Sequence, residues 1–293
     1  MITVFGASGH TGGAAAAQLL KAGKKIRVVA RHKEKLARFT QSGAEAAVGD
    51  IESASFVREA LTGAEAAYLM IPPNMATDDF RAYQQRLADA YVAAAEATGV
   101  RYVVLLSSIG AQHREGTGPI VALHDLEERL KRIVPLNALF LRAGWFMENV
   151  LYELVGVKGK GVYSAPMPAN TAVPAIASAD IGSYAGSRLE RLDFSGKSVI
   201  HLIGPRAITQ TELVSQLSQA VGKPIRYQQT SFEEAEQALR QAGMKPSLVS
   251  LFAEMQRGAS KGLLAPEDGG AVVQGKTTFE TFAHEVFAPA YRA

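Results

Sequence analysis

Cysteine is absent from this chain of 293 residues. Without thiols the protein can form no disulfide, no thiolate metal site and no cysteine nucleophile, and it suits a reducing cytosol. The six histidines are scattered and show no metal-ligand spacing such as H-E-x-x-H, so we expect no metal site. Long apolar runs are also missing, and glycines interrupt the N-terminal MITVFGASG. We therefore expect no membrane span, no secretory signal and a cytoplasmic location.

A large excess of charge of one sign is missing as well. The chain has 31 Lys and Arg against 28 Asp and Glu, a formal net charge of +3. Nucleic-acid binders usually gather their cations on one face or tail. The densest basic run here, residues 21–35, is interrupted by the strand-like IRVV. We predict no nucleic-acid binding and interpret the end of this run as part of a ligand site.

Strand-like and helix-like segments alternate along the first half of the chain. Short apolar runs at 2–5, 26–30, 44–48, 66–71, 101–106 and 138–142 predict strands. Helical patterns lie between them, at 11–22, at 119–133 and in a long helix that Thr77 would cap and Gly99 would end. This alternation predicts βαβ units, and the continuously apolar strands predict helices on both sheet faces. We expect an α/β fold with a doubly wound, mostly parallel Rossmann-type sheet over residues 1–150.

The alternation weakens after residue 150. Residues 156–171 are rich in Gly, Pro and Ala and predict a loop. Further helices are expected at 176–192, 209–221, 232–243 and 278–287, with strands at 199–203 and 224–228. We predict that residues from about 172 to 204 complete the sheet. Residues 151–171 and 205–293 would then form a smaller, discontinuous C-terminal lobe that binds the substrate.

The most informative motif is Gly6-Ala7-Ser8-Gly9-His10-Thr11-Gly12. It follows a strand and opens a helix, as a dinucleotide-binding fingerprint must. The first glycine allows the tight turn, the second lets the main chain approach a pyrophosphate, and the third lets helix and strand pack closely. The helix N-terminus adds free N–H groups and a positive dipole end. We predict that residues 6–12 bind the cofactor phosphates; an ordinary glycine turn is the alternative.

Basic residues occupy the end of the second predicted strand, the position that determines whether such folds bind NAD or NADP. NAD-binding proteins usually place an acid at the end of the second strand, on the ribose 2′-hydroxyl. Here the sequence reads Ala30-Arg31-His32-Lys33. Arg31, with Lys33 nearby, could grip a 2′-phosphate that a carboxylate would repel. The sequence therefore predicts that NADP(H) is preferred over NAD(H), unless these residues are only a solvated helix start.

Two more loops should line the same crevice, because ligands of open α/β sheets bind at the carboxyl ends of the strands. After the third strand, we expect Asp50 to bond the adenine and Ile51 to pack on its ring. After the fourth, we expect Ile71, Pro72 and Pro73 to lie near the ribose. Alternatively, the aspartate only caps the next helix and the prolines only end a strand.

Taken together, these segments resemble the NmrA-like branch of the short-chain dehydrogenases. Further matching segments are LRAGWFMEN at 141–149, the D-I-G step at 180–182 and the helix start at 275–278, so the resemblance covers nearly the whole chain. It implies an atypical short-chain dehydrogenase with a small substrate lobe. Members of the quinone oxidoreductase and triphenylmethane reductase type suggest a small flat acceptor, such as a quinone. A homodimer is compatible with the resemblance.

Tyrosine is missing from residues 103–151, where the superfamily carries its catalytic Tyr-x-x-x-Lys pair. That mechanism is therefore absent, which also argues against a sugar-nucleotide epimerase. Ser107 ends the fifth strand at the superfamily's serine position, and we predict that it contacts the cofactor. On the next helix, His124 would donate a proton or hydrogen bond while Glu128, four residues on, holds its tautomer. Alternatively, the histidine binds the nicotinamide ribose or lies on a solvated face.

Aromatic side chains after the sixth strand are candidates for the acceptor pocket. We predict that Trp145, Phe146, Asn149 and Tyr152 wall this pocket, although the aromatics could equally be core. Our hypothesis is direct hydride transfer from NADPH, without flavin or metal, in which placement of the reactants supplies most of the rate. The alternative is a redox-sensing regulatory protein that binds NADP(H) without turnover and passes its preference to a partner.

Overall fold

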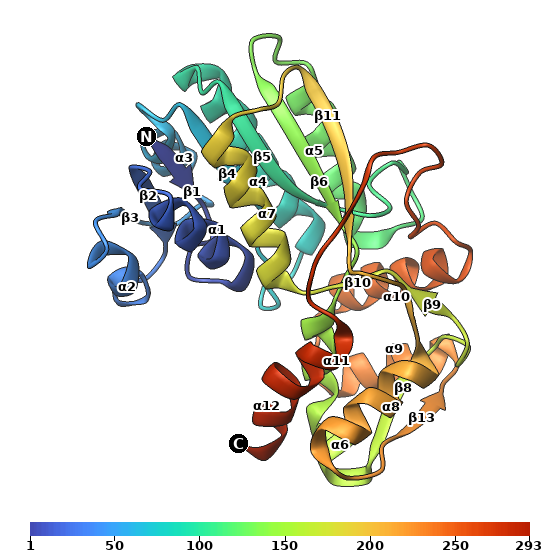
Figure 1. Cartoon of the computed structure of the whole chain (residues 1–293). Helices are drawn as coiled ribbons and strands as arrows, with labels where there is room; N and C mark the ends of the chain where they lie inside the picture. Colours follow the sequence, from blue (N-terminus) through green and yellow to red (C-terminus); the bar gives the residue numbers. More distant parts are fainter.

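The computed structural model describes all residues, 1–293, and contains one central sheet of eight strands (Figure 1). All neighbouring strands of this sheet pair in parallel. The spatial order is β14-β11-β6-β5-β4-β1-β2-β3, and the direction of winding reverses between β1 and β4. The predicted doubly wound α/β fold is confirmed. The strands are β1 (Ile2–Val4), β2 (Ile26–Ala30), β3 (Glu45–Val48), β4 (Ala66–Leu69), β5 (Tyr102–Ser108), β6 (Asn137–Ala143), β11 (Lys197–Ile203) and β14 (Val272–Gln274).

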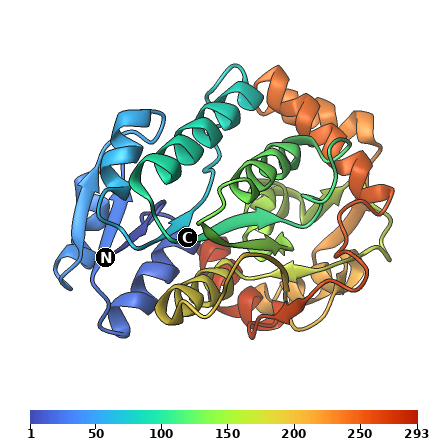
Figure 2. The ribbon, with the colours of Figure 1, turned by 90° about the horizontal axis from the view of Figure 1, so that it is seen from above.

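Helices cover both faces of the sheet, as the continuously apolar strands predict (Figure 2). On one face α1 (His10–Lys21) packs on α7 (Ser178–Arg191), and a short helical turn, η1 (Lys33–Leu36) with α2 (Ala37–Thr40), follows β2. A Cβ on Gly182 would lie 2.1 Å from the carbonyl oxygen of Thr11, so this glycine lets α1 and α7 approach closely. The other face carries α3 (Ala54–Leu61), α4 (Phe80–Thr98), η2 (Gly118–Ile120) and α5 (Val121–Lys131).

A smaller lobe lies below the sheet in Figure 1 and has a core of its own. The chain enters it directly after β6 and again after β11. Its strands form three two-stranded pairs, β7–β10, β8–β13 and β9–β12. Its elements are β7 (Trp145–Phe146), η3 (Met147–Glu153), α6 (Leu154–Lys160), β8 (Val162–Ala165), β9 (Ala172–Val173), β10 (Ala175–Ile176), β12 (Ile208–Thr209), α8 (Gln210–Val221), β13 (Arg226–Gln229), α9 (Phe232–Gln241), α11 (Phe279–Phe282), η4 (Ala283–Phe287) and α12 (Ala288–Arg292). Helix α10 (Pro246–Ser260) follows α9 and packs on η2 and on the core of the second sheet face.

The structure differs from the sequence prediction at several places. Residues 156–171, predicted as a loop, contain the end of α6 and all of β8, because the buried Val157 packs this short helix on the core of the lobe. Helix α10 and the edge strand β14 were not predicted, and β14 lies in the range assigned to the smaller lobe. The cap of α4 is Asp79, not Thr77: its carboxylate accepts the N–H of Ala82 at 2.9 Å. No helix is long and apolar enough to cross a membrane.

Candidate active site

The glycine turn between β1 and α1 has the form that the motif predicts. Gly6 has a φ of +66°, which only glycine adopts readily, and its carbonyl accepts the N–H of Gly9 at 2.9 Å. Gly9 is the N-cap of α1, and no side chain bonds to the first helical turn. The N–H groups of His10, Thr11 and Gly12 have no acceptor within the chain. The start of α1 therefore offers free donors and a positive dipole end to an anion.

Gly12 lets this turn close tightly on itself. A Cβ at this position would lie 2.4 Å from the carbonyl oxygen of Gly6, and main-chain atoms cannot rotate away from it. Ala7 is fully buried below the turn, whereas Ser8, Gly9 and the neighbouring histidine are exposed at its mouth. The exposed part of the turn is therefore main chain and small side chains, which permits close approach of a ligand.

Two cations predicted to choose the cofactor are free at the end of β2. Arg31 and Lys33 are exposed, and neither forms a hydrogen bond or ion pair within the chain. The acid next to them, Glu34, lies 3.8 Å from Nδ1 of His32 instead. An arginine without a carboxylate partner keeps all its donors available for a phosphate.

Asp50 and Ile51 follow β3 as expected. Oδ1 of Asp50 accepts the N–H of Glu52 at 3.0 Å, and Oδ2 makes no hydrogen bond within the chain. The cap of α3 is Ser53, whose hydroxyl accepts the N–H of Phe56, so the alternative that Asp50 only caps this helix is wrong. Ile51 is half-buried against the core.

The proline loop after β4 is held by two tyrosines of α4. Tyr83 donates its hydroxyl to the carbonyl of Pro72 at 3.0 Å, and Tyr91 donates to that of Met70 at 2.9 Å. Burial raises the pKa of Tyr83 to about 12, so its hydroxyl stays protonated and remains a donor. Residues 71–73 are thus presented at the carboxyl edge as a fixed surface beside the glycine turn.

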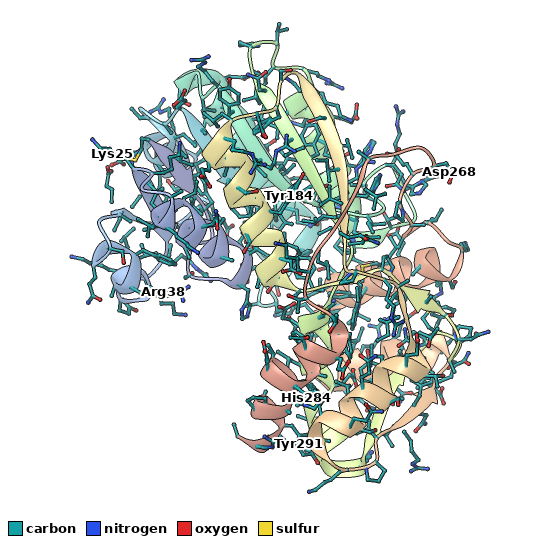
Figure 3. The ribbon with its side chains drawn as sticks, viewed as in Figure 1. Lys25, Arg38, Tyr184, Asp268, His284 and Tyr291 are labelled. Carbon is teal, nitrogen blue, oxygen red and sulfur yellow. The ribbon has the colours of Figure 1, made fainter.

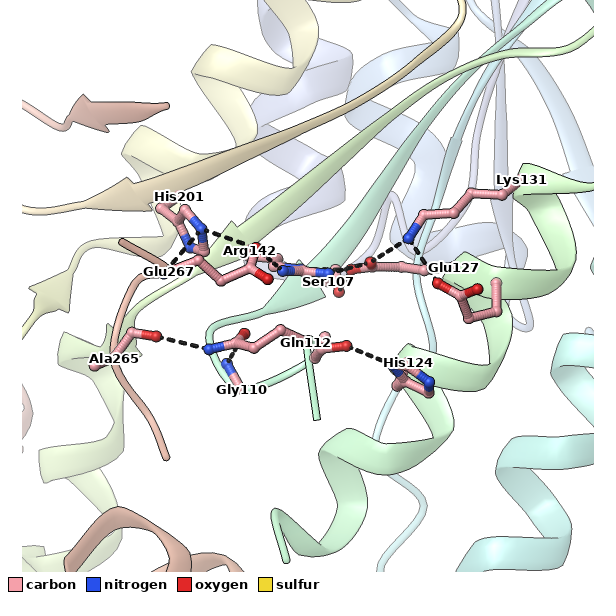
Figure 4. A network of polar contacts seen from close by, with 12 residues as sticks. Ser107, Gly110, Gln112, His124, Glu127, Lys131, Arg142, His201, Ala265 and Glu267 are labelled. Atoms are coloured by element: carbon pink, nitrogen blue, oxygen red, sulfur yellow. Dashed lines mark hydrogen bonds and ion pairs between the residues drawn. The ribbon is translucent and has the colours of Figure 1, made fainter. Parts of the chain in front are cut away.

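Ser107 is hydrogen-bonded to a buried ion pair, Glu127 with Arg142, that the sequence did not predict (Figure 4). Its side chain is almost fully buried and donates to Oε1 of Glu127 at 2.6 Å. Arg142, opposite Ser107 in the strand register, donates to both oxygens of the same carboxylate, at 3.1 and 2.7 Å. The serine hydroxyl therefore has a partner within α5, on the helix where the superfamily carries its tyrosine and lysine.

Arg142 bridges two carboxylates. Its third donor, Nη1, lies 2.6 Å from Oε2 of Glu267, in the segment that we call the strap, residues 261–271. Burial lowers the pKa of Arg142, but the two carboxylates outweigh this and raise it above its ordinary value. Beside it on β11, the fully buried His201 accepts the N–H of Glu267 at 3.3 Å. The network thus ties the strap to the carboxyl ends of β5, β6 and β11.

His124 and Glu128 do not form the predicted pair. The Nδ1 atom of His124 lies 2.8 Å from the carbonyl oxygen of Ala111 and must carry the proton to donate to it. Glu128 accepts from Lys131 at 2.7 Å instead, and this lysine holds its pKa below the usual range. His124 is 9% exposed, so only a small part of its side chain reaches solvent.

The open side of His124 faces a surface groove between α4 and α5, of about 650 Å³. None of the residues predicted to bind the cofactor, apart from His124 itself, lines this groove. The geometry therefore gives no support to His124 as a proton donor at a nicotinamide. The groove is lined by Gln85, Ala88, Asp89, Arg114, Ala122, His124, Asp125, Glu128, Arg129 and Arg132.

The residues predicted to wall the acceptor pocket lie where the chain leaves the sheet for the lobe. Trp145 and Phe146 form β7 and are half-buried; the tryptophan packs on the core of the lobe and the phenylalanine on a cluster beside the sheet. Asn149 is half-buried in η3, and Tyr152 is 73% exposed. The aromatic pair therefore serves at least partly as core, while Tyr152 is open to solvent.

Comparison with known proteins identifies the family. The profile of the NmrA-like family matches residues 1–268. The chain belongs to the NmrA-like family. A curated member from Streptomyces griseus, a (4-alkanoyl-5-oxo-2,5-dihydrofuran-3-yl)methyl phosphate reductase, is 30% identical and aligns over 91% of this chain and 90% of its own length. Quinone oxidoreductase 2 of Escherichia coli is 27% identical, with 89% of each chain covered.

A solved structure confirms the fold of this family member. The Citrobacter triphenylmethane reductase complexed with NADP(H) superimposes with a TM-score of 0.81 and 22% identity, covering 98% of this chain and all of that one. The family match over residues 1–268 confirms the resemblance read from the motifs. An NAD(P)H azoreductase of Xenophilus azovorans is also similar, with 26% identity over 92% of this chain and 88% of its own length. Since these curated relatives are oxidoreductases that align over about nine-tenths of the chain, this NmrA-like protein is an oxidoreductase of the NAD(P)H-dependent class.

Proposed function

We propose that this NmrA-like protein uses NADPH to reduce a small, flat, conjugated acceptor such as a quinone. The observation that carries the proposal is the uncapped start of α1, with three free N–H groups. Residues 6–12 would hold the diphosphate, and Arg31 with Lys33 would hold the 2′-phosphate. Bound NADPH would supply the hydride.

Conjugated acceptors suit a chain without the tyrosine–lysine pair. A quinone and an oxo-dihydrofuran, the substrates named for two relatives, both carry a carbonyl conjugated with a ring double bond. Charge that arrives with a hydride spreads onto oxygen in such molecules, and water can then deliver the proton. No strong acid is needed, so the protein's main task is to place the acceptor beside the nicotinamide. Trp145, Phe146, Asn149 and Tyr152, on the lobe side, are our candidates for the walls.

Mixing the protein with NADPH and a panel of quinones and quinoid dyes tests the proposal. Loss of the nicotinamide absorbance should accompany reduction of at least one acceptor, and NADPH should serve better than NADH. An enzyme that turns over none of the panel would contradict catalysis. If it then bound NADPH and NADP with very different affinities, the redox-sensing alternative would replace it.

A further inference from the structure

The space above Gly13, in the first turns of α1, is filled by an arginine. A Cβ at this buried glycine would lie 2.7 Å from Nη2 of Arg38 and 3.2 Å from the carbonyl oxygen of Ala7. The same guanidinium lies over the ring of Phe39, with its carbon 4.5 Å from the ring centroid. Arg38 belongs to α2, beside α1 (Figure 3). The missing side chain at Gly13 is therefore what seats this cation against the glycine turn.

Arg38 has no anionic partner within the chain, although its position is unfavourable for a cation. It is exposed and forms no hydrogen bond or ion pair through its side chain. It stands beside the N-terminal part of α1, where the helix dipole is positive and no acidic residue occupies the first turn. Arg31 and Lys33 add further unpaired positive charge after β2. A guanidinium held in this positive electrostatic potential is stabilised when a multiply charged anion binds beside it.

We infer that Arg38, seated on Gly13, is a second specificity-determining residue that binds the 2′-phosphate of NADP(H). This inference rests on the proposed cofactor site. Arg31 follows β2, whose Val29 carbonyl accepts the N–H of Ala7 in the glycine turn at 3.3 Å, whereas Arg38 lies against the same turn from α2. The two guanidinium groups would clamp one phosphate between them. NADH lacks that phosphate and would gain no binding free energy from either guanidinium group.

Arg38→Met is the deciding variant, because methionine keeps apolar contact with Phe39 and removes only the charged donors. Loss of a hydrogen-bonded charge pair should weaken NADPH about 10- to 100-fold, while NADH binding changes less than about threefold. Gly13→Ala should act in the same direction, since the added methyl group displaces the guanidinium. The matched control is Arg101→Met, another exposed arginine over an aromatic ring, Tyr102, which lies at the amino end of β5, away from the carboxyl ends of the strands.

Calorimetric titration of each purified variant with NADPH, NADH, 2′,5′-ADP and 5′-ADP gives the readout. A loss confined to NADPH and 2′,5′-ADP in Arg38→Met, with Arg101→Met unchanged, supports the inference. An unchanged NADPH affinity, or equal weakening of NADPH and NADH, overturns it. Failure of the wild-type protein to bind either dinucleotide would instead overturn the proposed function. Thermal unfolding of the free variants shows that each is folded.

Discussion

At the scale of single residues, the cofactor turn depends on a hydrogen atom at Gly12. An added methyl group would lie 2.4 Å from the oxygen and 2.6 Å from the carbon of the Gly6 carbonyl. We expect Gly12→Ala to cost about 1–3 kcal/mol or more of unfolding free energy and to abolish NADPH binding. Urea unfolding and titration measure both. Gly159→Ala in α6, where nothing lies within 4 Å, should leave both unchanged or gain up to about 1 kcal/mol.

The buried pair of Glu127 and Arg142 is the second feature at this scale. Glu127→Gln would leave a nearly fully buried guanidinium without its bidentate partner, and we expect a loss of about 3–5 kcal/mol in urea unfolding. Glu267→Gln should cost about 1 kcal/mol or less, because the side chain of Glu267 is 45% exposed. Equal losses in the two variants would show that burial does not set the strength of this network.

Removing both charges shows how much of the loss in Glu127→Gln comes from the unpaired buried charge of Arg142. The double variant Glu127→Leu with Arg142→Met leaves no buried charge, so it should recover much of the stability that Glu127→Gln loses. Urea unfolding of the single and double variants completes the comparison. A double variant as unstable as the single one would mean that the strap and Ser107 need the ion pair for their packing.

At the scale of elements, the buried parallel strands could be predicted because they must be apolar on both faces. The predicted strand 138–142 is β6, observed at Asn137–Ala143. Strand β14 could not be predicted in this way: it has three residues at the sheet edge, and Val272 is 48% exposed. Helix α10 buries only four of its residues, so its apolar pattern is weak and its place depends on contacts far away in the sequence.

The site divides in the same way into local and distant contributions. The glycine turn is formed by neighbouring residues, so its motif predicts its geometry. The contact of Arg142 with Glu267 joins residues 125 positions apart, and no local pattern indicates it. The spacing of His124 and Glu128 permits a contact, but Lys131 is the partner that the glutamate takes. Spacing on a helix shows which side chains can meet, and competing charges decide which do.

Asp180 joins two elements that the family motifs mark separately. At the start of α7 it accepts the N–H groups of Lys276 and Thr277, both at 2.8 Å, and the hydroxyl of Thr277 at 3.1 Å. Asp180→Ala removes these charge-assisted bonds, so we expect a loss of about 1.5–3 kcal/mol and faster amide exchange over residues 276–287. Hydrogen-exchange mass spectrometry measures the exchange, and urea unfolding measures the loss of stability. Asp193→Ala, which removes only surface ion pairs, should leave exchange there unchanged.

We expect the buried His201, which contacts the strap, to make the free energy of unfolding sensitive to pH. Burial, and then the charge of Arg142, lower its pKa below the ordinary value, which is about 6.5. Above that pH it is neutral in both states. As pH falls below it, the unfolded chain takes up a proton that the folded chain does not, so stability declines. We expect His201→Gln to show a smaller decline in unfolding free energy from pH 7 to 5 than wild type.

The matched control is His284→Gln, which removes an exposed histidine of the lobe. This variant should keep the wild-type decline between pH 7 and 5, because it leaves the buried imidazole in place. A decline in His201→Gln as large as that of wild type would show that other groups cause it.

At the scale of the whole molecule, the chain passes repeatedly between the sheet and the smaller lobe. It enters the lobe after β6, returns for α7 and β11, enters again at β12, and comes back for β14 before ending in α12. A Cβ on Gly144 or Gly204 would lie 2.0 or 2.2 Å from a carbonyl oxygen of residues 174–175, so these crossings are tightly packed. Neither part is a separate stretch of sequence, and we expect them to unfold together.

Ligand binding tests this coupling, because a dinucleotide that binds only the folded state stabilises everything that unfolds with its site. At 100 times its dissociation constant, NADPH should add about 2.7 kcal/mol to the unfolding free energy. We expect a single unfolding transition that NADPH shifts as a whole. The fluorescence of Trp145, at the lobe, and far-ultraviolet circular dichroism should both report this same transition. In Gly12→Ala neither signal should shift. The contradicting outcome is two separate transitions, with the one reported by Trp145 unaffected by NADPH. It would show that the lobe unfolds independently of the cofactor site.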